Sequence, residues 1–536
     1  MTLSTTRTKT TFVQPAAPLE AQTITCSAVE NICERCYVTT SAFWPVPDSA
    51  DPLPQYDILT KSLSYVLYQR PILAGTLRQD NRGAFSVEIP PAPGAGCDFH
   101  YADLRDDAEI PTYEELERRG FPFADGNEDG LAKLRPARVP EAWDGSPVIV
   151  CQMSRLRGCV VLLLLMSHQV ADPVAVVVFV LQFAGLTEEM EKAVLAGGPL
   201  PDLPERFEPA MEDRALLSPR PSEADCDEKS LELKQYVSIR GMDSLSVLAA
   251  RRNLFPKSYI PPRLTGRAEQ LWRTTVGIWK FSPAKLDQLR DIVRQASPEA
   301  SKPPSDLDAI TAFLWQRFFV AKHSPSENPS TPQTSHILYA GDVRRRLDPP
   351  LPQFFLSACV DLFRASQDTT SLTPATSSSS LGASLASAIQ AIRQTLGDWN
   401  EKTYRRMLAE SSQGDAVPGW IPRGPLEFIF SDHSRAGIVF DSSWGEGLGK
   451  VGISREPYLG RPCPAGEITV MPRLATGDLE VRIAGEVATL ERLLADELMK
   501  EFCPNVFLVR PFGKVDGLVK GSALSNGNGL ALEVKP

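Results

Sequence analysis

Histidine is scarce in this chain, whose 536 residues include only five. These are His100, His168, His323, His336 and His433. A Gly-x-Ser-x-Gly elbow is also missing, which argues against a serine hydrolase. One Cys-x-x-Cys pair, Cys33 and Cys36, has no second pair with which to complete a zinc site. We therefore expect no bound metal, and base chemistry near neutral pH must rely on few imidazoles.

The chain has neither a basic excess nor a long uninterrupted apolar segment. Its net charge of −10 argues against a nucleic-acid partner, which would favour a basic surface. The most apolar stretch, Cys159–Leu186, is interrupted by Ser167, His168, Gln169 and Asp172, and neither half of it reaches the ~20 residues that a spanning helix needs. Residues 1–25 contain no apolar signal core, and the ten cysteines are scattered. We expect a cytoplasmic protein without a membrane span.

Composition shifts divide the chain into two unequal halves. Hydrophobic residues make up 43% and charged residues 23%, as in a globular protein too long for one ordinary core. Residues 187–235 are polar, acidic and rich in proline, and we interpret them as a crossover linker. A mobile N-terminus is expected at 1–22, a first half at 23–186, a second half at 236–514 and a disordered tail at 515–536.

Strands and helices are predicted in both halves, which indicates the α/β class. A continuous run of valine and leucine from Gly158 to Met166 predicts a strand buried on both faces. Helical spacing of apolar residues predicts a helix from Leu59 to Leu67, ended by Pro71. The other predicted strands are 84–89, 147–153, 274–280, 336–342, 427–429, 438–440, 467–471 and 479–483. The other predicted helices are 283–295, 308–320, 381–399 and 489–501.

The segment Ser167-His168-Gln169-Val170-Ala171-Asp172 follows the most apolar predicted strand, and a second apolar run begins at Val174. His168 is the only histidine with apolar runs on both sides, so it is the best candidate for a buried base. If the segment is helical, the spacing places His168 and Asp172 within one turn. A core histidine is an equally good interpretation, and Asp172 before Pro173 also suits a helix N-cap.

Two later segments carry further candidates. Three arginines, Arg344 to Arg346, leave the strand predicted at 336–342 and meet a rigid proline turn. Arg344 could pair with a buried carboxylate or a phosphate, and a solvated basic patch is the alternative. The segment Asp441-Ser442-Ser443-Trp444-Gly445 is typical of a tight turn after a strand, and its glycine spacing matches neither the dinucleotide nor the P-loop pattern.

In order along the chain, these segments resemble the BAHD acyltransferases, in particular the fungal branch that includes the trichothecene acetyltransferases. Residues 26–31 are similar to the family's opening Leu-Ser-x-Leu-Asp-Gln, and 71–77 resemble its Pro-Leu-Ala-Gly-Arg-Leu. His168 to Asp172 matches the His-x-x-x-Asp motif. Val343–Pro352 is similar to Arg-Ser-Arg-Leu-x-Pro-Pro-Leu-Pro, and Asp441–Gly445 stands where the family has Asp-Phe-Gly-Trp-Gly.

The chain departs from the family at positions around the expected acceptor pocket. Pro173 replaces the usual glycine after the motif, and Ser442 and Ser443 replace phenylalanine and glycine. Residues 355–358 read Phe-Leu-Ser-Ala where Phe-Gly-Asn-Ala is common, and Ser431-Asp432 replaces a Ser-Trp pair near the substrate channel. The base is retained, so these changes affect the pocket and the channel and leave the chemistry in place.

The resemblance implies a fold of two chloramphenicol-acetyltransferase-like halves, each a mixed sheet flanked by helices, with a channel between them. It implies an O-acyltransferase that moves an acyl group, expected to be acetyl, from acyl-CoA to a hydroxyl of a fungal secondary metabolite. Acyl-CoA is then a co-substrate, no cofactor is bound permanently, and the protein is expected to act as a monomer on a small-molecule alcohol. Acylation of nitrogen is the open alternative.

The resemblance also implies roles for individual residues. His168 would act as general base in a ternary complex, without a covalent intermediate, and Asp172 would pair with Arg344 to orient it. Ser431 would contact the substrate. Near the site, Asp441, Trp444 and Gly445 would shape the fold.

Two other functions remain open from the sequence. A condensation-domain relative would use carrier-protein thioesters, but such enzymes carry a doubled histidine where this chain has Ser167 before His168. A non-catalytic ligand-binding protein on a decayed acyltransferase fold is the second alternative, supported by the altered Asp441–Gly445 segment. Turnover of free acyl-CoA would separate the acyltransferase from both.

Overall fold

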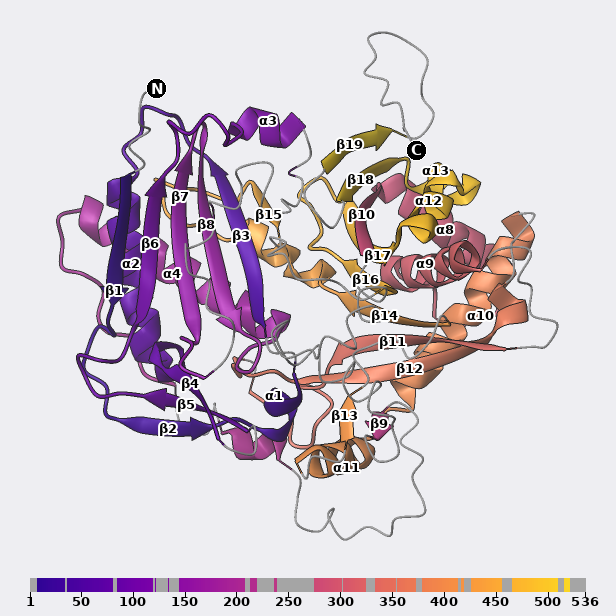
Figure 1. The fold of residues 1–536 in the computed structure, drawn as a ribbon, viewed down its shortest axis with the longest axis horizontal. Helices are drawn as coiled ribbons and strands as arrows, with labels where there is room; N and C mark the ends of the chain where they lie inside the picture. Colours follow the sequence, from indigo (N-terminus) through magenta and orange to yellow (C-terminus); the bar gives the residue numbers. More distant parts are fainter. Residues whose placement is uncertain are drawn as a thin grey trace, which may run out of the picture.

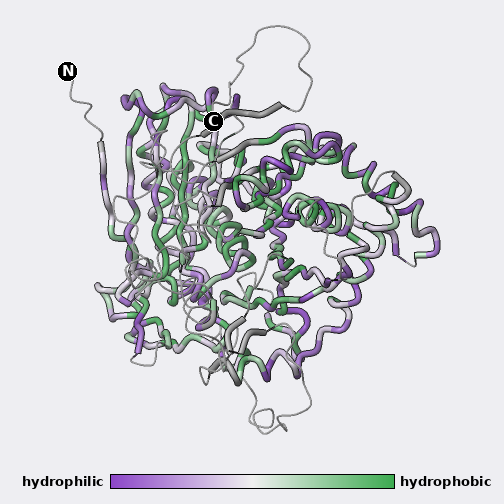
Figure 2. Tube along the Cα trace, turned by 45° about the vertical axis from the view of Figure 1, so that its right-hand side comes forward, coloured by the Kyte–Doolittle hydropathy of each residue, from purple (hydrophilic) through white to green (hydrophobic). Residues whose placement is uncertain are grey.

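Two mixed β-sheets, each flanked by helices, lie side by side in the computed structural model (Figure 1). Apolar segments gather inside both halves, and hydrophilic ones lie mainly toward the outside (Figure 2). This arrangement agrees with the prediction of an α/β chain in two halves. The structure describes residues 7–33, 36–80, 84–118, 121, 134, 144–207, 213–218, 236–238, 274–300, 302–323, 333–352, 354–372, 378–412, 416–418, 426–455, 465–509 and 515–520.

The first half is a six-stranded sheet covered by two long helices, α2 (Leu53–Gln69) and α4 (Pro173–Leu195), which pack against each other. Its strand order is β1 (Arg7–Val13), β6 (Cys97–Asp103), β7 (Ile149–Leu156), β8 (Cys159–Ser167), β3 (Tyr37–Pro45) and β15 (Ile453–Arg455). Smaller elements complete it: β2 (Gln22–Thr25), β5 (Phe85–Ile89) and β4 (Thr76–Gln79) form a second sheet, and the short helices are α1 (Ala28–Ile32), η1 (Pro71–Ala74) and α3 (Tyr113–Arg118).

The second half is an eight-stranded sheet with its own helical layer. Its strand order is β12 (Val360–Asp368), β11 (Thr334–Asp342), β14 (Glu427–Asp432), β16 (Glu467–Val470), β17 (Leu479–Glu486), β10 (Thr274–Phe281), β18 (Asn505–Val509) and β19 (Val515–Lys520). Its helices are α8 (Pro283–Ala296), α9 (Asp306–Lys322), α10 (Ser378–Gly397), α11 (Glu401–Ser412), α12 (Val487–Ala495) and α13 (Glu497–Phe502). The remaining pieces are η4 (Arg214–Leu217), η8 (Thr369–Leu372), η9 (Ser434–Asp441) and the β9 (Tyr236–Ser238)–β13 (Ala416–Pro418) pair.

The core elements form where the sequence is apolar in all directions. Every residue of β8 is buried, because this strand pairs with β3 on one side and β7 on the other, and the sheet is covered on both faces there. α9 is apolar around most of its circumference and is buried along nearly its whole length, as expected of a helix inside a large core. Both elements were predicted; the structure shifts the strand by one residue toward the C-terminus and extends the helix by two residues at each end.

One strand crosses between the halves and could not be foreseen from local pattern. β15, which belongs by sequence to the second half, pairs antiparallel with the outer edge of β3 in the first sheet. The residues before it, from His433 to Val451, also contact the first half and contribute apolar side chains to its core. The halves are therefore joined by β15 and the segment before it, as well as by the crossover linker.

The predicted ends of the halves need correction. Arg7–Val13, placed in the mobile N-terminus, forms β1 along β6, and Val515–Lys520, placed in the disordered tail, forms β19 along β18. Unpaired strand edges were available at both places, which local composition does not reveal. α4 continues through the boundary at 186 to Leu195, because Met190 and Glu191 are still buried. Residues 521–536 and most of 208–235 lie outside the described residues.

One predicted element is wrong in kind, and another is divided in two. Residues 438–440 belong to the 3-10 helix η9 and not to a strand: Ile438 is 52% exposed while Val439 and Phe440 are both buried, so the burial lacks the alternation of a strand. The helix predicted at 489–501 is two helices. Asp496 separates them, because its carboxylate caps α13 by accepting a hydrogen bond from the Met499 N–H, 2.9 Å away.

α4 is the one helix in the described part of the chain that is long and apolar enough to cross a membrane, judged by length and composition. Its inner face packs on the first sheet through Ala175, Val176, Phe179 and Phe183, all buried. We therefore assign its apolar character to the core of the first half.

Candidate active site

The turn between β8 and α4 holds the candidate base. β8 ends at Ser167, whose carbonyl accepts hydrogen bonds from the N–H groups of Val170 and Ala171, at 2.9 and 3.0 Å. These bonds form a tight turn that projects His168 from the end of a fully buried strand. The His168 N–H donates to the Cys36 carbonyl, 2.8 Å away, just before β3. The backbone of His168 is therefore fixed by two strands of one sheet.

The His168 ring is mostly buried. Its Nδ1 atom is inaccessible and makes no hydrogen bond of good geometry to the residues that the structure describes. Burial lowers the pKa of His168 below its ordinary value of 6.5; its own backbone carbonyl and Asp172 oppose this shift, and His433 adds to it. The ring is therefore neutral at physiological pH, which is the state that a general base requires.

Asp172 and Arg344 form a buried, two-pronged ion pair between the halves. The Arg344 Nη1 and Nη2 atoms donate to the two carboxylate oxygens of Asp172, each at 2.9 Å. The carboxylate also accepts hydrogen bonds from the N–H groups of Ala175 and Cys359, both at 2.9 Å. Burial alone would raise the pKa of Asp172, but Arg344 and the two N–H groups outweigh it and lower that pKa. Asp172 is thus both the predicted N-cap of α4 and the predicted partner of Arg344.

Arg344 also holds the extended segment Phe355–Cys359. Its Nη2 donates to the Ser357 carbonyl at 2.5 Å and its Nε to the Phe355 carbonyl at 3.4 Å. Because the Cys359 N–H bonds to Asp172, the segment is attached to both members of the pair. This is the segment in which Leu356-Ser357 replaces the family's Gly-Asn.

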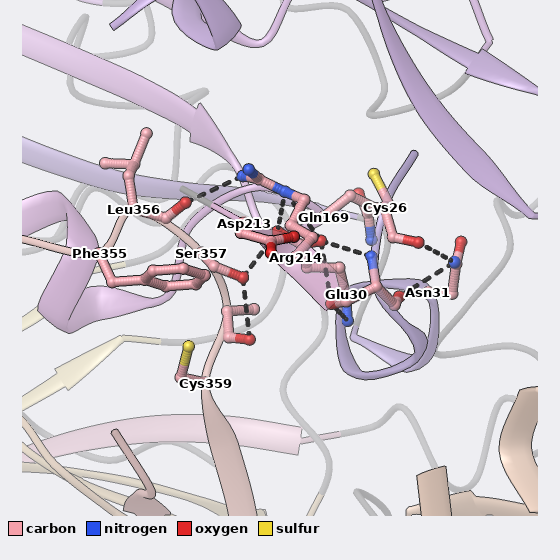
Figure 3. Close-up of polar contacts among 12 residues, drawn as sticks. Cys26, Glu30, Asn31, Gln169, Asp213, Arg214, Phe355, Leu356, Ser357 and Cys359 are labelled. Carbon is pink, nitrogen blue, oxygen red and sulfur yellow. Dashed lines mark hydrogen bonds and ion pairs between the residues drawn. The ribbon is translucent and has the colours of Figure 1, made fainter. Parts of the chain in front are cut away.

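A second buried arginine–carboxylate pair also contacts this segment (Figure 3). Arg214, from η4 in the predicted crossover, donates its Nε to both Glu30 oxygens, at 3.0 and 3.2 Å. Its Nη2 donates to the Leu356 carbonyl at 2.9 Å, and the Ser357 hydroxyl donates to Glu30 at 2.7 Å. Glu30 also accepts the Ser27 N–H at 2.7 Å, which completes a capping box at the start of α1.

This second pair is connected, through α1, to the turn that carries His168. The Cys33 carbonyl at the end of α1 accepts a hydrogen bond from the Gln169 side chain, 3.2 Å away. Gln169 follows His168 directly, and its side-chain oxygen accepts from the Ser167 hydroxyl at 3.2 Å. Sequence reasoning missed Glu30 and Arg214 as supports of the site. The only available signal was the capping-box pattern at Ser27–Glu30, since nothing local identifies Arg214 as the partner of Glu30.

The loop after η9 brings Trp444 against α4. The Trp444 ring makes edge-to-face contacts with Trp44 and Phe183, at centroid distances of 5.2 and 5.3 Å, each worth about 0.5–1.5 kcal/mol beyond area burial. Gly445 follows with a φ of +90°, and the Gly447 N–H donates to the Glu191 carboxylate, 3.0 Å away. Trp444 and Gly445 therefore shape this loop, in keeping with their predicted structural role.

Gly445→Ala is expected to destabilise the protein by about 1–3 kcal/mol, because alanine is strained at this positive φ. An added Cβ would also collide with the buried Glu191 carboxylate. Urea unfolding measures the loss. The matched control is Gly449→Ala in the same loop: its φ of +72° carries the same kind of strain, but a Cβ there meets no atom. Equal losses for the two variants would contradict the predicted collision.

Two predicted site residues lie differently from expectation. Asp441 is exposed, and its side chain makes no hydrogen bond or ion pair to the described residues, so the structure gives no support for its predicted structural role. Ser431 is half-buried on β14, in register with Ala340 on β11 and Thr469 on β16. It is not among the residues that line the pocket described next, and its contact with substrate remains a prediction.

An apolar pocket lies between the first sheet, α4 and the segment that crosses from the second half. It contains about 680 Å³ of empty space, part of it open to solvent, and its walls are mainly valine and leucine side chains from β3, β8 and α4. Pro173, the first residue of α4, also lines the pocket and lies two residues after the turn that carries His168. Polar side chains are few. The lining polar residues are Thr39, Thr40, Ser454 and His433. Such a pocket suits an apolar molecule with few polar groups.

The described residues offer no group of three His, Cys, Asp or Glu side chains that could hold a metal ion. The cysteines that the structure describes are free, and most are buried. Burial raises the pKa of these thiols, including Cys36 to about 12, so they are protonated and weakly reactive. Cys33 and Cys36 thus behave as packed side chains.

Comparison with known proteins identifies the fold and the family. Residues 3–372 match the model of the Transferase family. Acyltransferase clz6 of Cochliobolus lunatus is 25% identical over 507 residues, which cover 91% of this chain and 97% of clz6. Trichothecene 3-O-acetyltransferase TRI101 of Fusarium sporotrichioides is 23% identical over 422 residues, which cover 74% of this chain and 77% of TRI101.

The crystal structure of TRI101 from F. graminearum, in complex with coenzyme A and T-2 mycotoxin, has the same fold. It matches this chain with a TM-score of 0.66 and 17% identity, over 90% of this chain and 99% of the TRI101 chain. The predicted fold of two chloramphenicol-acetyltransferase-like halves is thereby confirmed, as is the resemblance to the fungal branch of BAHD acyltransferases. The chain belongs to the Transferase family and is an acyltransferase.

Proposed function

We propose that this acyltransferase transfers an acyl group, acetyl in the simplest case, from acyl-CoA to a hydroxyl of an apolar secondary metabolite, with His168 as general base. The observation that carries the proposal is the geometry of the turn. A mostly buried, neutral imidazole stands at the end of a rigid strand, fixed by Cys36 on one side and followed by the Asp172–Arg344 pair. Family membership and a fold shared with a CoA-binding acetyltransferase support the choice of reaction.

The two ring nitrogens of His168 have different tasks in this proposal. Nδ1 is buried, so we assign Nε2 as the nitrogen that meets the substrate. Nε2 takes the proton of the acceptor hydroxyl while the oxygen attacks the thioester carbonyl carbon. The carbon–oxygen bond forms, the carbon–sulfur bond breaks, and the imidazolium returns the proton to the CoA thiolate. The protein itself never carries the acyl group.

Asp172 has a positioning role in this mechanism. Its four hydrogen bonds go to Arg344, Ala175 and Cys359, so its carboxylate is saturated by structural partners. It therefore fixes the start of α4 and, with it, the turn that carries His168. The cytoplasmic location and monomeric state expected from the sequence belong to the same proposal.

The acceptor can be identified by disrupting the gene in the producing organism and comparing metabolites by mass spectrometry. We expect one apolar alcohol to accumulate and its acylated product to disappear, with a mass difference that identifies the acyl group. Restoring the gene with the His168→Ala substitution should leave the alcohol in place, whereas the wild-type gene should remove it. Removal of the alcohol by the His168→Ala gene would contradict the proposed base.

The pH dependence of kcat/KM should show one acidic limb that belongs to His168. The neutral imidazole is the active form, and burial lowers its pKa, so activity should be constant through neutral pH and fall only below about pH 6.5. The Asp172 pKa is also lowered, so its ion pair stabilises the fold above pH 3.8 and is lost only as the pH falls further. The limb is therefore catalytic and not an unfolding transition. Initial rates between about pH 5 and pH 8 measure it; a half-maximal pH above 7 would contradict the prediction.

A further inference from the structure

His433 is the residue of the crossing segment that stands between the two halves at the pocket. It follows β14 and precedes η9, and its N–H donates to the Val470 carbonyl, 2.8 Å away at the end of β16. Its own carbonyl accepts the Ala436 N–H at 2.9 Å, so its backbone is held on both sides. His433 lines the apolar pocket together with Pro173, the first residue of α4.

The pocket is polar at few places, and this makes the position of His433 informative. The Thr40 and Ser454 hydroxyls lie 3.1 Å apart and hydrogen-bond to each other, which leaves them less able to bind a ligand. Among the described residues that line the pocket, His433 alone has a side chain that can carry a charge. The part of α4 that lines the pocket, Pro173 to Val180, is about 10 Å long, so the pocket suits an elongated apolar body with its polar end near the turn.

Two titratable side chains act electrostatically on His168: Asp172, the N-cap of α4, and His433 of the crossing segment. Arg344, which follows β11, is paired with the Asp172 carboxylate. Of these, only His433 lies both within electrostatic range of His168 and on the pocket wall. His433 thus stands on the wall of a pocket that Pro173, five residues after His168, also lines.

We propose that His433 is a second substrate-facing imidazole, which hydrogen-bonds a polar atom of the substrate and holds its reacting end within reach of His168. The inference rests on the proposed function and deepens it. The substrate class is an elongated apolar molecule with a hydroxyl or carbonyl at the end near the turn. This polar end belongs either to the acceptor alcohol or to the acyl group of the thioester, since both present an oxygen to the base.

Histidine-selective ¹³C labelling tests the contact without any need for turnover. Only five imidazole signals arise, and His168→Gln and His433→Gln assign the two of interest. Octanol serves as the acceptor-like probe and octanoyl-CoA as the acyl-like probe, with octane as the probe that lacks oxygen. We expect octanol or octanoyl-CoA to shift both signals, and the one that does so identifies the source of the polar atom. Octane should leave His433 unshifted.

Variants of His433 separate hydrogen bonding from packing. His433→Phe should weaken binding of the effective probe by about 10-fold, while His433→Gln, which keeps a polar side chain, should stay within about 3-fold of wild type. In a pH titration, His433→Gln should raise the pKa of His168, because a nearby positive charge is removed. Ala436→Val changes the same wall without a polar group; it should alter the affinity for octane and octanol equally.

Two outcomes would overturn the proposal: a His433 signal that no oxygen-bearing probe shifts, or equal binding by His433→Phe and His433→Gln together with an unchanged His168 titration. Failure of the proposed function is seen separately. In that case wild-type protein transfers no acyl group to any alcohol, whatever the probes do to the two imidazole signals.

Discussion

His168→Ala is expected to lower kcat by about 10²–10⁴-fold, since that is the usual contribution of a positioned general base. KM for acyl-CoA should change little, because the proposed task of the ring is proton transfer. Thermal unfolding should remain close to wild type, because Nδ1 makes no hydrogen bond to the described residues and the turn is held by backbone bonds. Continuous detection of the released CoA thiol, with the acceptor found from metabolite analysis, measures the loss.

His336→Ala is the matched control for that variant. His336 lies on β11, and its Nδ1 hydrogen-bonds the Ser366 hydroxyl at 2.8 Å near the surface, far along the strand from Arg344. The His336→Ala variant also loses one of the five imidazoles, and its kcat should stay within about 2-fold of wild type. A His168→Ala enzyme as active as the His336→Ala enzyme would end the assignment of the base.

Arg344→Met is expected to destabilise the protein by about 3–5 kcal/mol, the usual consequence of leaving one charge of a buried pair without its partner. Asp172 would keep only the N–H groups of Ala175 and Cys359, and the segment 355–359 would lose two hydrogen bonds to the guanidinium. Urea unfolding measures this change. Arg345→Met is the matched control: Arg345 is the exposed neighbour in the same run, so its loss should stay within about 0.5 kcal/mol.

A second substitution distinguishes an unpaired buried charge from lost packing. Asn at position 172 can still cap α4 but carries no charge, so Asp172→Asn with Arg344→Met should recover a large part of the stability that Arg344→Met loses. Simple addition of the two losses would contradict the pairing. The double variant should still turn over slowly, since residue 172, which follows the turn that carries His168, is then tied to the second half only through the Cys359 N–H.

The turn that carries His168 could be predicted because its signals are local. A run of valine and leucine fixes β8, and Asp172 before Pro173 fixes the start of α4, so the placement of His168 between them follows from about 20 consecutive residues. The pairing of Asp172 with Arg344 was available only from the family resemblance. The two residues are 172 positions apart, and the residues themselves left a solvated arginine as an alternative.

Features that depend on distant pairing escaped prediction. β15 is only three residues long, and it is a strand because the edge of β3 is available to it. Arg214 lies in a stretch whose composition indicates a linker, yet its side chain is buried and donates hydrogen bonds to Glu30 and the Leu356 carbonyl. His433 carries no local signal of function; its place on the pocket wall follows from the way the second half reaches across to α4.

The central claim is that one imidazole moves the proton while the acyl group passes directly from CoA to the alcohol. Liquid chromatography with mass spectrometry of an equimolar mixture of protein, acetyl-CoA and acceptor tests it in a single run. The account predicts an unmodified protein mass throughout, acylated alcohol with the wild-type protein, and intact acetyl-CoA with His168→Ala. An acylated protein, or acylated alcohol formed by His168→Ala at the wild-type rate, would contradict it.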